Sequence, residues 1–267
     1  MKVIDLTHTI ESTMPVYPGT EPPTLVTANT WEQDGFKETR ISMHSHTGTH
    51  MDPPAHIFRG RTTLDAFPPE QFIGKALVID CTALQEGEAI TMEQLLPYGE
   101  KVKEADFLLF HLGWDTRGGT EAYFGDFPCI DDTVLDLILT GDYKGIGFDV
   151  ISIDPIDDLT RHRKLFREKD IVNIENLCNL GLCGSELFWF SCFPLKIADS
   201  DGSPPDFCKP PIKQRKKLQV LVREQRTRML QLAREAEREG VTSAELAAVR
   251  CMIEACAADL DASWQKA

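Results

Sequence analysis

The chain has 267 residues, of which 42% are hydrophobic, and it carries 42 acidic and 28 basic side chains for a net charge of −14. This length and composition allow one globular domain with a sizeable core and one smaller element. The apolar runs are only as long as strands, whereas a membrane-spanning helix needs about 20 apolar residues, so we predict no membrane span. We also expect no signal peptide, and we expect the eight cysteines to be free thiols in the cytoplasm.

Apolar runs and turn residues predict an α/β chain with more strand than helix before residue 204. Some of these runs are continuously apolar, which is typical of strands that are covered on both faces. The predicted strands are residues 3–7, 24–28, 39–43, 76–80, 107–112 and 187–193. The predicted helices are residues 92–96, 133–140 and 163–168, with Thr91 and Asp132 as N-caps of the first two.

Residues 44–56 read HSHTGTHMDPPAH, so four of the seven histidines and one aspartate lie within thirteen positions. Neutral imidazoles and a carboxylate are ligands that Zn²⁺ and Mn²⁺ accept. A lone histidine is more often an ordinary core or surface residue, but this density indicates a metal site. The spacing leaves open whether His44 or His46 binds the ion, because both have the same strand parity.

The local sequence argues against the helical pair of histidines that zinc proteases use. His46 and His50 flank Thr-Gly-Thr, which disfavours helix. A turn at Gly48, where a positive φ costs little, folds His46 back toward His50. In an extended chain His50 and Asp52 point to the same face, and the two prolines that follow present His56 near the same point.

The pattern His46-x-Gly-Thr-His50-x-Asp52-x-Pro-x-His56 resembles the signature of the metal-dependent cyclase family. That family includes bacterial kynurenine formamidases, isatin hydrolases and some proteins called polyketide cyclases. Further stretches agree over about residues 1–204: VIDLTH at 3–8, residues 107–115 ending in GWD, GFD at 147–149, SID at 152–154 and IENL at 174–177. The resemblance implies a three-layer β/β/α swivelling-type fold.

The resemblance also implies the roles of individual residues. His46, His50 and Asp52 would hold a first Zn²⁺ or Mn²⁺ ion, and Asp52 would bridge to a second ion held by His162 and Glu175. The interval from His162 to Glu175 is one residue longer than the family's usual spacing, so we expect one or two ions. Metal-bound water ionises near neutral pH, and His56 would serve as the catalytic acid or base.

The function expected from this resemblance is hydrolysis of a small-molecule aryl formamide such as N-formylkynurenine. The alternatives are ring opening of an isatin-type lactam, a lactonase or cyclase reaction, and a metal-binding scaffold without turnover. Several aromatic residues are candidates for an aryl pocket, although aromatic side chains more often serve the core. Trp114 is the best of them because it follows a predicted strand at Gly113.

The C-terminal stretch differs from the rest of the chain. Residues 205–211 form a proline-rich linker, and residues 212–267 show helical spacing interrupted at Gly240, which predicts an α-helical hairpin. From residue 209 onward the chain has 12 basic and 8 acidic side chains. A basic hairpin beside an acidic body favours docking in cis or in a homodimer or higher oligomer. Nucleic-acid binding is disfavoured because no aromatic residues are interleaved with the basic ones.

Overall fold

The computed structural model describes residues 3–208. The predicted helical hairpin at 212–267 lies outside the described residues. The predicted linker at 205–211 does not begin as a linker, because Pro205–Cys208 form strand β11 and pair antiparallel with β10. This strand lies at an edge of the sheet and begins at its proline, a position at which the missing N–H costs no ladder hydrogen bond.

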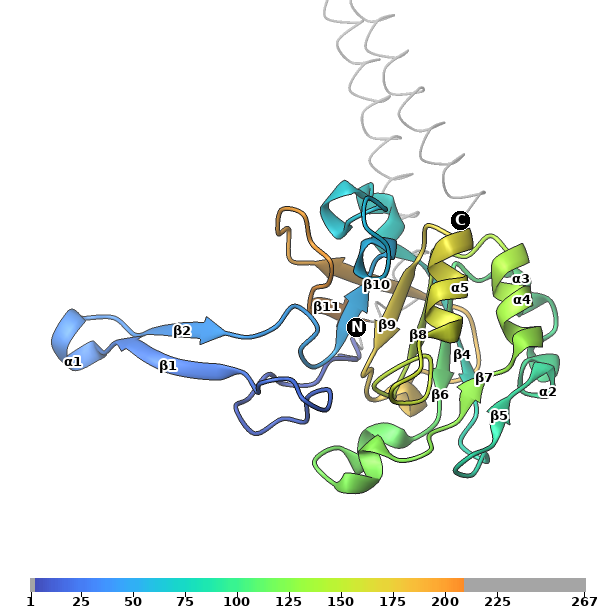
Figure 1. Cartoon of the computed structure of the whole chain (residues 1–267), viewed down its shortest axis with the longest axis horizontal. Coiled ribbons are helices and arrows are strands. Elements are labelled where there is room, and N and C mark those ends of the chain that lie inside the picture. Colours follow the sequence, from blue (N-terminus) through green and yellow to red (C-terminus); the bar gives the residue numbers. More distant parts are fainter. Residues whose placement is uncertain (1–2, 209–267) are drawn as a thin grey trace, which may run out of the picture. The chain divides into compact units, whose positions relative to one another are not determined.

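A seven-stranded mixed sheet in the order β11-β10-β4-β6-β8-β9-β3 forms the centre of the fold (Figure 1). Four neighbouring strands are parallel, and β10 and β3, which flank them, are antiparallel to them, whereas the edge strand β11 is antiparallel to β10. The parallel strands are β4 (Ile73–Asp80), β6 (Phe107–His111), β8 (Gly145–Phe148) and β9 (Val172–Glu175). The others besides β11 are β10 (Phe188–Pro194) and β3 (His50–Asp52).

The other elements are short. Two small sheets pair β1 (Thr24–Asn29) with β2 (Glu38–Ser42), and β5 (Ala89–Ile90) with β7 (Cys129–Ile130). The α-helices are α1 (Trp31–Asp34), α2 (Met92–Leu95), α3 (Glu100–Glu104), α4 (Asp132–Thr140) and α5 (Thr160–Glu168). The 3₁₀ helices are η1 (Pro54–His56), η2 (Leu64–Ala66), η3 (Pro69–Phe72), η4 (Leu96–Tyr98), η5 (Trp114–Arg117), η6 (Glu121–Phe124) and η7 (Leu180–Leu182).

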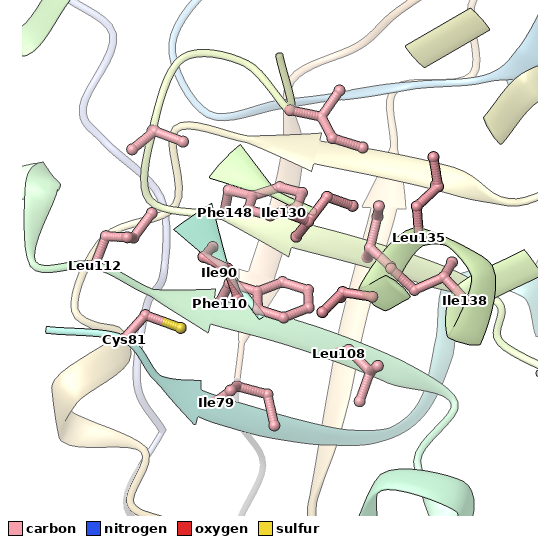
Figure 2. Close-up of a cluster of buried hydrophobic side chains, with 14 of the residues drawn as sticks. Ile79, Cys81, Ile90, Leu108, Phe110, Leu112, Ile130, Leu135, Ile138 and Phe148 are labelled. Carbon is pink, nitrogen blue, oxygen red and sulfur yellow. The ribbon is translucent and has the colours of Figure 1, made fainter. Parts of the chain in front are cut away.

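The central strands are buried on both faces. Along β6, Leu108 and Phe110 belong to one hydrophobic cluster, whereas Phe107 and Leu109 belong to a second cluster. This alternation is the period of two expected of a strand. Figure 2 shows the first cluster, in which side chains of α4 such as Leu135 meet those of the sheet. The prediction that continuous apolar runs mark strands covered on both faces is confirmed.

The α/β class is confirmed, and five of the six predicted strands form: β1, β2, β4, β6 and β10. The prediction for residues 3–7 is wrong, because this segment forms no strand and is tied to the body by a hydrogen bond from the Cys178 N–H to the Leu6 carbonyl. The three predicted helices form as α2, α4 and α5. Thr91 caps α2 as predicted, but the cap of α4 is Asp131 rather than Asp132, because Asp131 Oδ1 accepts from the Val134 N–H.

Two further expectations concern the whole described range. None of the helices within residues 3–208 is long and apolar enough to cross a bilayer. Cys81, Cys129, Cys178 and Cys192, four of the cysteines whose side chains are described, are free thiols.

Phe110 tests the importance of the first cluster for stability. Its ring is fully buried and stacks on Phe148 with a centroid separation of 5.0 Å. We expect Phe110→Ala to lower the free energy of unfolding by about 3–5 kcal/mol, because the cavity that remains cannot collapse against a sheet. Urea unfolding measures the loss. Leu182→Ala, at a position that is 58% exposed, is the control and should change stability little.

Candidate metal centre

The pairing of β3 with β9 brings two of the predicted ligands together. His50 lies opposite Glu175, and Asp52 lies opposite Asn173. Because side chains alternate along a strand, all four point to one face, as predicted for His50 and Asp52. Met51 points the other way and is fully buried. The distance from His50 Nε2 is 3.4 Å to Asp52 Oδ1 and 3.6 Å to Glu175 Oε2.

A turn before β3 folds His46 back onto the same face. Gly48 has a φ of +65°, and a Cβ atom there would lie 2.7 Å from the Met14 side chain, so the turn requires glycine. His46 Nδ1 consequently lies 2.7 Å from Asp52 Oδ1, and the His46 and His50 rings lie 5.1 Å apart. The predicted turn is confirmed. His46 therefore faces Asp52, whereas His44 lines the cavity but belongs to neither cluster of possible ligands.

Helix α5 supplies His162 from the other side of Asp52. His162 Nε2 lies 3.2 Å from Asp52 Oδ2, so the two oxygens of this carboxylate face different histidines. Buried Asp154 fixes the start of the helix by accepting from the backbone N–H groups of Arg161 and His162. The extra residue in the interval from His162 to Glu175 does not keep either side chain away from Asp52.

The charges of this cluster shift the pKa values of its acids. Burial raises the pKa of Asp52, but the His46, His50 and His56 imidazoles and a hydrogen bond with His162 outweigh burial and hold that pKa well below its usual range. Burial and the charge of Asp52 raise the pKa of Glu175 to about 8. A cation between the two carboxylates would remove this repulsion.

The pKa values of the buried histidines shift upward. Burial lowers the pKa of both His50 and His162, but the neighbouring Asp52 carboxylate outweighs burial and raises each above its usual value. Asp52 is therefore the group on which these imidazoles converge.

His56 lies at the open side of the cluster. It ends η1, directly after the two prolines, and its ring lies 4.0 Å from the His46 ring and 5.7 Å from the His162 ring. Desolvation lowers the pKa of His56 to about 4, and the three neighbouring histidines contribute in the same direction. The imidazole is therefore neutral at pH 7 and has a lone pair with which to accept a proton.

The donor atoms fit a divalent cation. Possible ligand atoms of His46, Asp52 and His56, and of His50, Asp52 and Glu175, lie within 4.8 Å of one another. His46 Nε2 is buried and makes no hydrogen bond, although Asp201 Oδ2 lies 3.4 Å away, so this nitrogen has a lone pair available for a cation. Imidazole and carboxylate donors suit Zn²⁺ and Mn²⁺ alike.

The cluster opens into a cavity of about 730 Å³. His46, His50, Asp52, His56, His162 and Glu175 all line it, and the rest of its wall includes residues 15–17 and 19–21 together with Ile151, Ser152, Asp157 and Leu159. The Asp157 N–H donates to the Tyr17 hydroxyl at 3.2 Å and joins the two sides of this wall. Sequence reasoning did not single out these wall residues individually, because loops carry no periodic pattern.

The structure does not place Trp114 on the cavity wall. Its side chain is only 2% exposed, belongs to the hydrophobic core, and donates from Nε1 to the Tyr123 carbonyl. The prediction that Trp114 binds substrate is therefore wrong, because the turn at Gly113 leads into η5 and packs the indole inward. Asn173 was also missed. It donates to Glu175 Oε1 at 2.8 Å, and its signal was a spacing of two from Glu175 within a strand.

A substitution at Asp52 tests whether this cluster binds a metal ion. We expect Asp52→Asn to weaken Zn²⁺ and Mn²⁺ binding by more than the roughly 10–100-fold loss that follows removal of an outer-shell partner. The reason is that it removes the charge on which three imidazoles converge. Chelator competition on the apo protein gives the affinities. Asp170→Asn, which removes a surface carboxylate paired with Arg61, is the control, and equal affinities for the two variants would contradict this assignment.

Known proteins resemble the chain in sequence. An uncharacterized protein of Methanocaldococcus jannaschii is 31% identical over 76% of this chain and 96% of its own length. A kynurenine formamidase of Bacillus cereus is 27% identical over 75% of this chain and 93% of its own length. This relative is a hydrolase.

Solved structures resemble the fold. Isatin hydrolase A from Labrenzia aggregata superposes with a TM-score of 0.70 over 78% of this chain and 93% of its own, at 22% identity. A structure described as a potential metal-dependent hydrolase with cyclase activity gives a TM-score of 0.61 at 26% identity, over 78% of this chain and 96% of its own. Residues 4–155 match the family described as putative cyclase, so the chain belongs to the putative cyclase family.

Proposed function

We propose that the chain is a metal-dependent amidohydrolase that cleaves an aryl formamide of the N-formylkynurenine type. The observation that carries the proposal is that His46, His50, Asp52, His162 and Glu175 line one cavity and gather around Asp52, with the neutral imidazole of His56 beside them. The kinship with kynurenine formamidase supports the choice of substrate.

We propose Zn²⁺ or Mn²⁺ as the cofactor. His46, His50 and Asp52 would hold a first ion, and Asp52 would share a second with His162 and Glu175, since one of its oxygens lies beside His46 and the other beside His162. A bound ion supplies two effects, acidification of a water molecule and polarisation of the substrate carbonyl.

His56 moves the proton in this proposal. Its neutral imidazole takes a proton from the attacking water as the new C–O bond forms at the formyl carbon. The imidazolium then returns that proton to the aryl nitrogen as the C–N bond breaks, which yields an aryl amine and formic acid, and the acid ionises to formate in water. The pKa of about 4 keeps His56 in its basic form before attack, and the resulting imidazolium is a strong acid toward the leaving nitrogen.

The cavity wall fits an aryl group. Pro15, Val16, Tyr17, Ile151 and Leu159 provide apolar surface in the same cavity as the ligand cluster. We propose that an aromatic ring packs on this surface while its formamide carbonyl meets the histidines. A lactam such as isatin presents the same kind of carbonyl on an aromatic ring, which makes lactam ring opening the second candidate.

His56→Ala tests the mechanism. We expect it to retain bound metal and to lose a factor of about 100 to 10,000 in kcat with N-formylkynurenine, because the water and the leaving nitrogen lose their proton carrier. His44→Ala is the matched control, since His44 also lines the cavity but lies outside both ligand clusters. A metal-replete His56→Ala protein with wild-type turnover would remove His56 from the mechanism. Isatin, assayed in parallel, separates the two candidate substrates.

We also propose a homo-oligomer in a reducing compartment such as the cytoplasm, where the free thiols would persist. An arm formed by β1, α1 and β2 supports assembly. Figure 1 draws this arm apart from the seven-stranded sheet, and no residue of β1, α1 or β2 is buried. Five large apolar side chains on it are exposed: Leu25, Val26, Trp31, Phe36 and Ile41. An isolated two-stranded hairpin is marginally stable in water, so a second copy is the partner we propose for it.

Substitutions at Trp31 and Phe36, the tip of the arm, test its proposed role in assembly. We expect the double variant Trp31→Ser, Phe36→Ser to lower the mass per particle in light scattering, because it removes two exposed aromatic side chains from the proposed contact. Leu96→Ser is the control, since Leu96 is 71% exposed on the body of the chain. Wild-type mass for the tip variant, or a monomeric wild-type protein, would contradict the proposal.

A further inference from the structure

Asn176 follows Glu175 directly and connects the metal centre to the body of the protein. It is buried and has a φ of +57°, a conformation that asparagine tolerates better than most residues. Its backbone N–H donates to the Val150 carbonyl at 2.8 Å, and its carbonyl accepts from the Thr49 hydroxyl at 2.5 Å. Its side chain therefore leaves β9 from a fixed point.

The Asn176 amide meets the carbonyl of Gly48. That carbonyl accepts two hydrogen bonds, one from Asn176 Nδ2 at 3.0 Å and one from His50 Nδ1 at 2.9 Å. The second bond places the proton of neutral His50 on Nδ1 and leaves Nε2 free, which is the nitrogen directed at Asp52 and Glu175. The position of the Gly48 carbonyl thus sets both the tautomer and the ring orientation of His50.

Tyr123 fixes the orientation of the same amide. Its hydroxyl donates to Asn176 Oδ1, so Nδ2 is the end of the amide that faces Gly48. Burial raises the pKa of Tyr123 far above its ordinary value, so the phenol remains a donor across the working pH range. Tyr123 comes from η6, belongs to the hydrophobic core and does not line the cavity, so it does not contact substrate.

We propose that Tyr123 and Asn176 are positioning residues for the metal centre. The chain of hydrogen bonds runs from the Tyr123 hydroxyl through the Asn176 amide to the Gly48 carbonyl and ends on His50. It links η6, the residue after β9 and the turn before β3, which are distant in sequence. The role rests on the proposed function, since it requires that His50 bind the metal ion.

Two matched pairs of variants test this role. Tyr123→Phe and Tyr143→Phe each remove one buried hydroxyl, but that of Tyr143 donates to the Val102 carbonyl outside the centre. Asn176→Gly and Asn179→Gly each remove a side-chain amide at a residue of positive φ, where glycine is tolerated. The amide of Asn179 donates to the Asp5 carbonyl instead.

The measurement is the dissociation constant for Zn²⁺ and for Mn²⁺, obtained by chelator competition on apo protein, together with urea unfolding of the apo form. We expect Tyr123→Phe and Asn176→Gly to weaken binding by roughly 10–100-fold, the range for lost outer-shell partners. Tyr143→Phe and Asn179→Gly should lower apo stability but retain wild-type affinity. The readout is binding, so it does not depend on turnover.

Three possible results would contradict the positioning role. Wild-type affinity in both Tyr123→Phe and Asn176→Gly, with apo stability lowered as in the controls, overturns the positioning role and leaves the metal centre intact. Equal loss of affinity in all four variants also overturns it, because the effect would then follow from general destabilisation. A wild-type protein that binds neither ion overturns the metal centre, and the positioning role with it.

Discussion

The register of a three-residue strand determines the whole site. β3 is at the edge of the sheet, and its central residue Met51 is held from both sides: it pairs with Ile174 of β9 and exchanges two backbone hydrogen bonds with Ser203. A shift of one residue would turn Met51 outward and send His50 and Asp52 into the core. Burial of one apolar side chain therefore keeps two ligands on the cavity face.

Electrostatics then distinguishes the two carboxylates that this register brings together. Asp52 is surrounded by imidazoles and stays ionised, whereas Glu175 is buried beside it and has a raised pKa. Without a cation the cluster tolerates one full negative charge more easily than two. The arrangement favours a divalent ion, because an ion lets both acids ionise while the histidines remain neutral ligands.

The segments around the cavity connect the chemistry with the rest of the molecule. Residues 15–17 and 19–21 line the cavity and lead into the arm, and the arm returns through β2 to His44 and His46. A contact made by the arm would thus lie between two stretches of cavity wall along the chain. On the inner side, Asn176 and Tyr123 tie the ligand turn to the core. The ligand turn is thus tied to the core, and the cavity wall continues along the chain into the exposed arm.

The amino-acid sequence by itself determined the features that depend on neighbouring residues. The period of two between His50 and Asp52, the turn at Gly48, the cap at Thr91 and the long apolar strands β4 and β6 follow from local geometry and hydrophobic pattern, and all were predictable. The dense histidine motif likewise indicated a metal centre and, through its resemblance, a family.

Only the tertiary structure decided the rest. The short strands β3, β8 and β9 carry too little pattern to be recognised, and they exist because neighbouring strands complete their hydrogen bonds. The inward packing of Trp114 depends on its contact with the next turn at Tyr123, and the composition of the cavity wall depends on how segments more than a hundred residues apart pack together. Local preferences cannot specify such contacts, because the free energy that fixes them is gained only when both segments are buried against each other.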